Sequence, residues 1–372
     1  MKKINIFNRD EMPNIEGSAV IVGASLSGLM TGIALAREGL HVTIVERAEE
    51  GRPGGAGLRV DGARFGQTKT EKLLRNLASG GQNSVQLWVS IEANLRAEAK
   101  SDARIDLRYQ TRVQDVDQDQ DSAWVITDKD ETIHGDILIG ADGHHSMVRR
   151  HVAPHKPNAT FAGYMAWMAS MNEEDLPENQ RPGYNQPRVR MLDSYNGFLF
   201  GSIIEREDGS GSRRIGCTWY DNSRNHLLRS LGCVKGDVAL HSLNGADIPE
   251  QTLIELAEQA SEKWEEPFAS VMRHATKTRT LIGIPIKEYV PDNLVKGRMA
   301  LVGDAAHVPA PITASGFNQS ILDAATLGEC VAKGIRGNAA MEAMREYESQ
   351  RLQTVRRMVQ SGQSYSQSFG RS

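Results

Sequence analysis

The chain has 372 residues, of which 40% are hydrophobic and 24% charged, and its formal net charge is −4. This composition is typical of a globular protein with one or two domains, and the small negative charge argues against nucleic acid or an anionic membrane as partner. The three cysteines, Cys217, Cys233 and Cys330, form no CxxC pair, which disfavours a disulfide framework and a thiolate metal site.

Residues 1–17 are mostly polar and contain no continuous apolar stretch of the kind found in signal peptides. We therefore expect a short leader and a cytoplasmic location. The uncharged run that follows contains glycine and serine next to a strand pattern, so a buried strand–helix unit is favoured over a membrane span.

Residues 18–47 predict a βαβ unit that binds a dinucleotide. An apolar run at 19–22 indicates a strand, the spacing of apolar residues over 26–34 indicates a helix that ends near Gly39, and a second apolar run follows at 42–45. Between strand and helix stands the motif GxSxxG, formed by Gly23, Ser25 and Gly28. Strand, glycine turn, helix, strand and a terminal acid are the parts of a dinucleotide site.

Each part of this motif has a physical role. Gly23 permits a tight turn, Gly28 allows close packing of helix on strand, and the amides at the helix N-terminus face a pyrophosphate. The Ser25 hydroxyl can bond a phosphate oxygen. Glu46, 23 residues after Gly23, stands where a carboxylate accepts from ribose hydroxyls. The alternative is a glycine-rich turn that binds nothing.

The next segments alternate between helix and strand patterns. A glycine-rich loop at 51–58 suits a surface turn or close approach to a flat ligand, and residues 88–99 have helical spacing. Strand patterns follow at 105–109, 111–113, 123–127 and 132–134. An apolar strand at 137–139 then ends in Gly-Ala-Asp-Gly, which places Asp142 at the carboxyl edge of a parallel sheet, with a helix from about Ser146.

Residues 161–281 predict an antiparallel sheet with helices, inserted into the dinucleotide-binding part. Short alternating runs rich in aromatics occur at 161–167, 189–192, 197–204 and 214–220. Helices are predicted at 250–263 and 267–274, and strands at 278–286 and 298–302. The last of these strands delivers Gly303 and Asp304 at its end, before a proline-containing loop and another helix. Residues 341–361 predict a final amphipathic helix that packs on the outside.

Three motifs in this order carry a specific resemblance. GxSxxG, then GADGxxSxVR, then GDAAHxxxPxxAxGxN resembles the flavin-dependent aromatic hydroxylases, the single-component FAD monooxygenases with the p-hydroxybenzoate hydroxylase fold. The resemblance covers roughly residues 18–360, and 162–167 and 217–222 are similar to the 2,6-dihydroxypyridine hydroxylase branch. It implies an α/β fold with a Rossmann-like FAD-binding domain (18–160 and 282–337), an inserted antiparallel-sheet substrate domain (161–281) and a C-terminal helical segment (338–372).

The resemblance also implies roles for single residues in binding FAD. Asp142 would bind the pyrophosphate region and the nicotinamide cofactor. The other implied FAD contacts are Gly23, Ser25, Ser27 and Gly28 at the pyrophosphate, Glu46 and Arg47 at the adenosine ribose, Val113 at the adenine, Gly303 and Asp304 at the ribityl or phosphate portion, and Ala314, Ser315, Gly316, Phe317 and Asn318 at the flavin ring. Many relatives have Gly at positions 25 and 314 and an Arg early in the helix that begins here at Trp88.

For the substrate site, the resemblance points to aromatic residues of the inserted sheet. The candidates are Tyr164, Trp167, Phe198, Phe200 and Trp219, with Pro311 near the flavin; for each aromatic the alternative is a core residue. His144, His145, His241 and His307 have no spacing that indicates a metal or a base. The sequence predicts no metal site and names no catalytic residue.

The resemblance thus implies an FAD-dependent monooxygenase that uses NAD(P)H and O₂ to hydroxylate a small aromatic or N-heteroaromatic ring through a flavin C4a-hydroperoxide. The expected partners are this substrate, O₂ and NAD(P)H, in a monomer or homodimer. Alternatives are a tailoring or antibiotic-inactivating monooxygenase of larger polycyclic products and a non-catalytic flavin-binding sensor or scaffold. A flavin halogenase lacks support, because its WxWxIP-type motif is absent. Substrate, hydroxylation position and reductant preference stay open.

Overall fold

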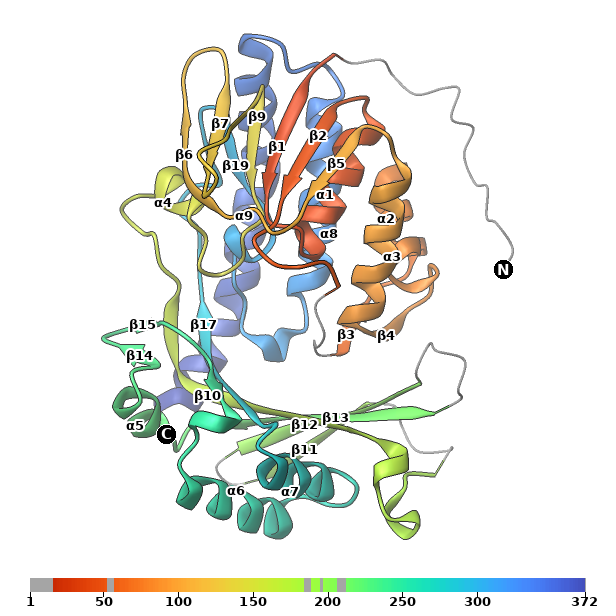
Figure 1. Cartoon of the computed structure of the whole chain (residues 1–372), viewed down its shortest axis with the longest axis vertical. Coiled ribbons are helices and arrows are strands. Elements are labelled where there is room, and N and C mark those ends of the chain that lie inside the picture. The colour runs from red at the N-terminus through yellow and green to blue at the C-terminus, as the bar shows by residue number, and fades with distance from the viewer. Residues whose placement is uncertain (1–15, 52–56, 184–188, 195–196, 206–211, 372) are drawn as a thin grey trace.

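The computed structural model describes residues 16–51, 57–183, 189–194, 197–205 and 212–371. Figure 1 shows two halves: a sheet flanked by helices above, and a wide antiparallel sheet resting on two helices below. The last helix, α9 (Asn338–Arg371), runs from the upper half to the lower one. The predicted leader and most of the loop at 51–58 lie outside the described residues.

The upper sheet has the strand order β18-β19-β9-β1-β2-β5. The pairs β19–β9, β9–β1, β1–β2 and β2–β5 are parallel, and only β18 pairs antiparallel. The bounds are β1 Ser18–Val22, β2 His41–Val45, β5 Ile105–Arg108, β9 Ile137–Gly140, β18 Val295–Lys296 and β19 Met299–Leu301. The parallel strands therefore end at one common edge, where ligands bind in open α/β sheets.

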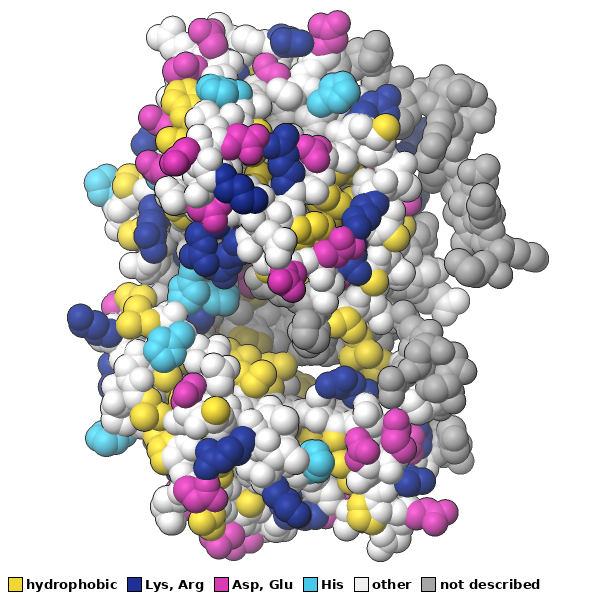
Figure 2. All heavy atoms as spheres, in the orientation of Figure 1, with side chains coloured by type: hydrophobic (Ala, Val, Ile, Leu, Met, Phe, Trp, Pro, Cys, Tyr) yellow, Lys and Arg dark blue, Asp and Glu magenta, His cyan; other side chains and the backbone are white. Residues whose placement is uncertain are grey.

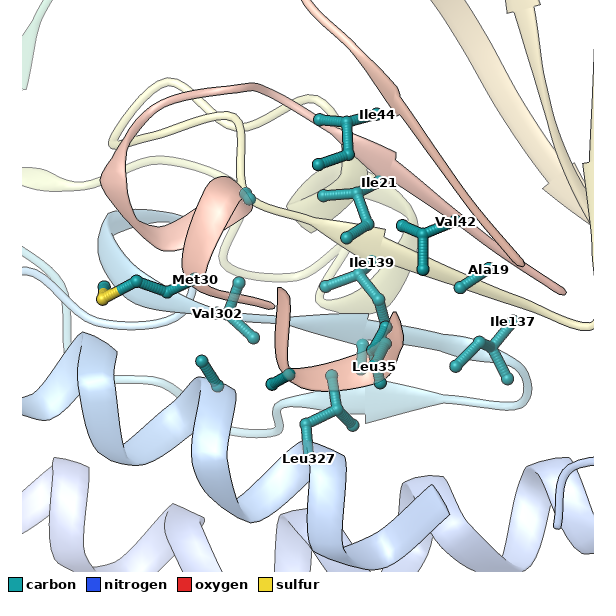
Figure 3. Packing of buried hydrophobic residues seen from close by; sticks show 14 of the residues in the cluster. Ala19, Ile21, Met30, Leu35, Val42, Ile44, Ile137, Ile139, Val302 and Leu327 are labelled. Carbon is teal, nitrogen blue, oxygen red and sulfur yellow. The ribbon is translucent and has the colours of Figure 1, made fainter. Parts of the chain in front are cut away.

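The core of the upper half lies between this sheet and its helices. Ile21, Ile44 and Ile139 stand on adjacent strands and point toward Leu35 of α1 and Leu327 of α8, and all five are fully buried (Figure 3). The apolar spacing in α1 (Leu26–Arg37) and α8 (Gly316–Val331) produces this face. Further helices are α2 Lys69–Ser79, α3 Trp88–Ser101 and α4 Val148–Val152; small sheets are formed by β3 Gly57–Val60 with β4 Ser84–Leu87, and by β6 Val113–Gln118, β7 Ala123–Thr127 and β8 Thr132–Gly135.

The lower sheet is antiparallel, with the order β11-β12-β13-β10-β15-β14, and β17 also pairs with β10. The long strands are β10 Thr160–Asn172, β11 Val189–Ser194, β12 Gly197–Glu205, β13 Arg213–Asp221 and β17 Ile282–Glu288; β14, β15 and β16 are two-residue strands at Val234–Lys235, Val238–Ala239 and Leu243–Asn244. Helices α6 (Glu250–Lys263) and α7 (Phe268–Thr278) cover its lower face, and α5 (Asn225–Ser230) lies at one end.

The predicted fold class is confirmed, but several elements differ from the sequence analysis. The strand predicted at 111–113 lies at Val113–Gln118 (β6), and helix α2 was not predicted. Helix α7 continues to Thr278, so the strand predicted at 278–286 begins only at Ile282 and extends to Glu288. The predicted final helix at 341–361 is ten residues longer at its C-terminal end, and it does not pack only on the outside, because Ser366 is buried against the lower sheet. The predicted division after residue 281 stays a prediction, although β17 still pairs within the lower sheet.

Among the described residues, no helix combines the length and the hydropathy that crossing a bilayer requires. In the same part of the chain, no group of three or more His, Cys, Asp or Glu side chains is arranged to hold a metal ion.

Candidate cofactor and substrate site

The three sequence motifs meet at the carboxyl edge of the upper sheet. A Cβ placed on Gly23 would lie 2.5 Å from the carbonyl oxygen of Ala141, so the first and second motifs are in direct contact. A Cβ placed on Gly303 would lie 2.6 Å from the Cβ of Ser27, so the third motif touches the first. The parallel strand order brings these segments together although they are about 120 to 280 residues apart in the chain.

The glycines of the first motif are required by close backbone contacts. Gly23 has φ +104°, and a Cβ on Gly28 would lie only 1.8 Å from the Gly23 carbonyl oxygen. Ser25 caps α1 with its backbone extended, makes no side-chain capping bond and is exposed. Its hydroxyl therefore stands beside the first-turn amides of α1, where a phosphate oxygen would bind.

Glu46 follows β2 and turns back toward this helix. Its two carboxylate oxygens accept from the backbone N–H of Ala24 and of Ala48, both at 2.9 Å. The backbone N–H of Thr111 donates to the Glu46 carbonyl at 2.9 Å, so the segment before Val113 lies alongside the end of β2. Arg47 is exposed. Glu46, Arg47 and Val113 are thus placed together, and their contacts with an adenosine remain proposals.

Asp142 carries a buried acceptor. Its Oδ2 accepts from the backbone N–H of Met147 (2.7 Å) and Val148 (3.2 Å), whereas Oδ1 is buried without a hydrogen-bond partner among the described residues. Desolvation raises the pKa of this carboxyl. An unpartnered buried oxygen costs about 1–3 kcal/mol, so a site with a hydroxyl-bearing ligand would satisfy it.

Arg149 ties the second motif to the third. Its guanidinium is fully buried and donates to the carbonyls of Pro157 (2.9 Å), Ala305 (3.1 Å) and His144 (2.5 Å), and it stands 4.3 Å from the ring centroid of Tyr289. The same nitrogen that reaches Ala305 also donates to the Asp304 carbonyl at 3.3 Å. Arg149 therefore holds the backbone on both sides of the cofactor edge.

We expect Arg149→Lys to lower the free energy of unfolding by about 2 kcal/mol, because one ammonium cannot reach carbonyls on three separate segments. Denaturant unfolding followed by tryptophan fluorescence measures this effect. The matched control is Arg150→Lys, since Arg150 is the exposed neighbour on the same helix, and it should be neutral. Equal stability of the two variants would contradict the assigned role of Arg149.

Asp304 follows β19 at the same edge. The residue is exposed to solvent at this edge. Behind it lies a buried ionic group. His307 Nε2 is 2.7 Å from Asp323 Oδ2, which also accepts from the Gly303 N–H (3.0 Å), and Arg351 Nε donates to Asp323 Oδ1 (2.9 Å). This group fixes the loop that carries Asp304.

The segment 314–318 joins the loop at Pro311 to helix α8. Ala314 has φ +47°, a conformation that favours glycine, which explains why many relatives have Gly there. The Asn318 side chain holds the strand β3 region, because its Oδ1 accepts from the Asp61 N–H (3.0 Å) and from Arg75 (3.1 Å). Among the described bonds, none is donated by the N–H of Gly316, Phe317 or Asn318, so these amides of the helix N-terminus point out of α8.

These residues fit a dinucleotide-type flavin cofactor. Two helix N-termini, an orphaned buried carboxylate oxygen at Asp142 and an acid at the end of β2 surround one edge of the sheet. Partial positive charge at helix ends suits a pyrophosphate and a reduced flavin edge, and carboxylates suit ribose and ribityl hydroxyls.

The upper face of the lower sheet presents an apolar strip to this edge. Strand register aligns one residue from each of five strands, and we call these residues the apolar strip: Met191, Phe200, Thr218, Met168 and Ile282. Met191 and Ile282, at the two ends of the strip, are 54% and 41% exposed, so the strip is open to solvent at both ends. Figure 2 shows a hollow between the two halves with hydrophobic side chains on its lower side.

Trp167 and Trp219 lie on the opposite face of the sheet. Both are buried in the core formed with α6 and α7, where the Trp219 ring lies 5.7 Å from that of Trp264. Because successive residues of a strand point to opposite faces, they cannot also face the cofactor edge. The structure gives them the core role that the sequence left as the alternative, and we no longer propose them as substrate contacts.

The other predicted substrate residues are on the cofactor side. Phe200 belongs to the apolar strip. Tyr164 is fully buried in the cluster with Phe198 and Tyr220, and its hydroxyl bonds that of Ser366 of α9 at 3.0 Å. Pro311 begins the turn η7 (Pro311–Thr313), whose Ile312 packs against Phe198 and its neighbours in the cluster on this face of the sheet.

A basic cluster lies at the junction of the two halves. Lys287 Nζ is 3.4 Å from His145 Nε2, and the His144 and His145 rings are 4.4 Å apart. Desolvation lowers the pKa of Lys287 to about 8. Desolvation and the charges of Lys287, Arg149 and Arg47 together lower the pKa of His145 to about 4. The histidines are therefore neutral near pH 7 and the cations repel one another, an arrangement that suits an anion.

Comparison with known proteins agrees with this geometry. The family model described as "FAD binding domain" matches residues 60–191 and 245–362. The chain belongs to the FAD-binding domain family. The resemblance to flavin hydroxylases and the FAD cofactor expected from the sequence are thereby confirmed.

Individual relatives are more distant. The chain is 26% identical over 226 residues to 2,6-dihydroxypyridine 3-monooxygenase of Paenarthrobacter nicotinovorans, covering 58% of this chain and 52% of that protein. It is 27% identical over 371 residues to an FAD-dependent urate hydroxylase of Klebsiella pneumoniae subsp. pneumoniae, covering 92% and 87%. The matched part thus spans about half of the first relative and most of the second. Their names agree with the interpretation as a monooxygenase of small rings, and the polycyclic and non-catalytic alternatives are not favoured.

Solved structures support the fold. The 2,6-dihydroxypyridine-3-hydroxylase from Arthrobacter nicotinovorans superposes with a TM-score of 0.74 at 20% identity, covering 95% of this chain and 93% of that one. The structure of CtdE in complex with FAD superposes with a TM-score of 0.73 at 16% identity, covering 96% of this chain and 97% of that one.

The roles of five side chains were not found from the sequence. Arg149 and His307 stand in motifs that we quoted, yet only the structure shows their partners. Lys287 is in a strand with no motif, and Asp323 and Arg351 are 28 residues apart on two helices. A buried charge in an otherwise apolar helix face, as at Asp323, was the one available signal.

Proposed function

We propose that this protein is an FAD-dependent monooxygenase that hydroxylates a small aromatic or N-heteroaromatic ring, with NAD(P)H as reductant and O₂ as oxidant. The observation that carries the proposal is the apolar strip on the upper face of the lower sheet, which faces the cofactor edge across the hollow. Its Phe200 packs against the same aromatic cluster as Ile312 of the turn at Pro311. When bound, the flavin supplies hydride acceptance and oxygen activation.

The chain's own residues would bind, orient and exclude water. The apolar strip would hold a flat ring by its faces, with Thr218 as the one hydroxyl in the strip. The first-turn amides of α8 would hold the flavin edge, and Ala314, Ser315 and Gly316 would fix that turn. The FAD contacts assigned to Gly23, Ser25, Ser27, Gly28, Glu46, Arg47, Val113, Asp142, Gly303, Asp304, Phe317 and Asn318 belong to this proposal.

The reductant would dock through its phosphates at the basic cluster. Lys287 is nearly buried, while His145 beside it is exposed, so an anion can approach from one side only. The described residues contain no second GxGxxG turn for a separate nucleotide domain, which suits transient docking. A cytoplasmic location and a monomer or homodimer complete the proposal.

Steady-state NAD(P)H oxidation by FAD-loaded protein tests the proposed reaction. Candidate rings are 2,6-dihydroxypyridine and 3-hydroxybenzoate, with product identified by mass spectrometry using ¹⁸O₂. A ring that stimulates oxidation and gains one labelled oxygen supports the proposal. Stimulated oxidation that yields only hydrogen peroxide with every ring, or protein that binds no FAD, would refute it.

We expect Lys287→Gln to raise the KM for NAD(P)H about tenfold, because one hydrogen bond to a charged group contributes about 1.5 kcal/mol. In the wild type, KM should rise as pH increases through about 8, where Lys287 loses its proton. The variant should lack this dependence. Lys296→Gln, an exposed lysine on β18, is the matched control. A variant with unchanged KM and unchanged FAD content would contradict the docking site.

A further inference from the structure

The C-terminal end of α9 lies on the cofactor-facing side of the lower sheet. Tyr365 and Phe369, one helical turn apart, form a stacked pair with ring centroids 5.8 Å apart and an interplanar angle of 12°. The Phe198 ring meets both of them edge-on, at 5.7 Å and 5.4 Å. We call Tyr365 and Phe369 the C-terminal aromatic pair.

Polar contacts fix this end of the helix to the sheet. Ser366, between the two rings in sequence, donates to Glu288 Oε1 at 2.5 Å and bonds the Tyr164 hydroxyl at 3.0 Å. Asn222 donates from Nδ2 to the Phe369 carbonyl at 2.8 Å. A Cβ on Gly370 would lie 2.5 Å from the Ala162 carbonyl oxygen, so the two backbones are in contact. The aromatic pair is therefore held by β10, by β17 and by the residue after β13, and it is no frayed terminus.

The pair also adjoins the segment that we assign to the flavin. A Cβ on Gly362, one turn before Tyr365, would lie 3.0 Å from Ala310 Cβ and from Thr313 Cγ2. Ile312, Tyr365, Phe369 and Phe200 pack partly buried against the same cluster on the sheet. The end of α9 thus contacts the turn at Pro311 through Gly362, and through its two rings it contacts Phe198, one row away from the apolar strip.

Two neighbouring rows of side chains, each formed by residues paired across the strands, differ in whether α9 covers them. Phe200 belongs to the open row, whereas Phe198 and Tyr220 belong to the next row, are 2% and 5% exposed, and stack on each other at 4.4 Å. The aromatic pair covers this second row and leaves the first open. Both of its rings remain partly exposed, so an occupant of the apolar strip can touch them.

We propose that the C-terminal aromatic pair is the inner boundary of the substrate pocket and limits the size of the ring system that the apolar strip accepts. This rests on the proposed function, because it assigns the strip to the substrate. Removing either ring would expose Phe198 and Tyr220 next to the apolar strip, and these two side chains are themselves flat aromatic surfaces. The second ring of a fused substrate would then contact Phe198 and Tyr220, where in the wild type it would clash with the aromatic pair.

The test measures binding of a matched pair of rings, 3-hydroxypyridine and 3-hydroxyquinoline, to FAD-loaded protein without NAD(P)H. Titration of the flavin absorbance gives both dissociation constants for the wild type, Tyr365→Ala and Phe369→Ala. Gln367→Ala, exposed on the same helical turn, is the control. Phe369→Leu is a milder variant, and FAD content and Tm are measured for every protein.

In both alanine variants, we expect the ratio of the quinoline to the pyridine dissociation constant to fall about tenfold, because space for apolar atoms in a pocket is worth a factor of this order. Gln367→Ala should keep the wild-type ratio, and Phe369→Leu should shift it less, in the same direction. If the alanine variants lose FAD, the leucine variant decides. An unchanged ratio in folded, FAD-loaded variants, or no binding of either ring to any protein, would overturn the inference. Binding without hydroxylated product when NAD(P)H is added would refute the proposed function alone.

Discussion

Replacing Gly28 with alanine is expected to prevent accumulation of folded, FAD-binding protein. The added Cβ would lie 1.8 Å from the Gly23 carbonyl oxygen and 3.0 Å from its carbonyl carbon, so α1 or the turn must move by more than an ångström. Alanine gains about 1 kcal/mol of helix propensity over glycine, but overpacking against rigid backbone costs about 3 kcal/mol or more. The turn that moves is the one that would hold the pyrophosphate.

Gly32→Ala is the matched control for this prediction. It lies on the same helix, but its Cβ would meet only the tip of the Ile44 side chain, at 2.6 Å, which can rotate. We expect its stability to stay within about 1 kcal/mol of the wild type. The measurements are soluble yield, the flavin absorbance of purified protein and Tm. Gly28→Ala protein with wild-type yield and flavin content would show that the close contact is relieved at no cost.

Replacing Asp323 with asparagine is expected to lower the free energy of unfolding at pH 7 by about 3 kcal/mol. The carboxylate is fully buried and accepts from Arg351, from the Gly303 N–H and from His307. An asparagine would turn an NH₂ group toward one of these donors and leave the Arg351 charge buried without its counter-ion. The loop that carries Asp304 would lose its support at Gly303.

The pH dependence of stability gives an independent check. Although desolvation alone would raise the pKa of Asp323, the charges of His307 and Arg351 hold it at about 2, below the value of about 3.9 in an unfolded chain. Its contribution is therefore present above pH 4 and is lost as the pH falls toward 2. Chemical unfolding between pH 2 and 7 should show this loss in the wild type and not in Asp323→Asn.

Asp292→Asn serves as the control for Asp323, because Asp292 is 59% exposed and its nearest cations are 3.6 and 3.9 Å away. Exposed pairs of this kind contribute between zero and about 1 kcal/mol. If both variants lost a similar free energy of unfolding, the buried ion pairs of Asp323 would stabilise the protein no more than exposed ones, which would contradict the prediction.

The cofactor half was largely predictable because its information is local. Gly23, Gly28 and Glu46 have a fixed spacing along one βαβ unit. The carboxyl ends of parallel strands lie at one edge of the sheet whatever the rest of the sequence. The same rule placed Asp142 and Asp304 beside them. The contacts of Gly23 with Ala141 and of Gly303 with Ser27 confirm that the three motifs adjoin.

The substrate side was not predictable to the same degree. Trp167 and Phe200 both stand in aromatic strands, yet they face opposite sides of the sheet, and which side faces the cofactor depends on where α6 and α7 pack. An alternation of residues gives two faces and does not say which one is covered. Only the tertiary arrangement separated the core tryptophans from the apolar strip.

By itself, the sequence determined the fold class, the FAD-binding motifs and the family, because glycine turns, strand ends and a terminal acid act through backbone geometry over short spans. The tertiary structure alone decided that Arg149 and Asp323 hold the motif loops, that Lys287 lies beside His145, and that α9 ends on the lower sheet. These are contacts between segments far apart in the chain. Their distances follow from packing, and no spacing in the sequence encodes them.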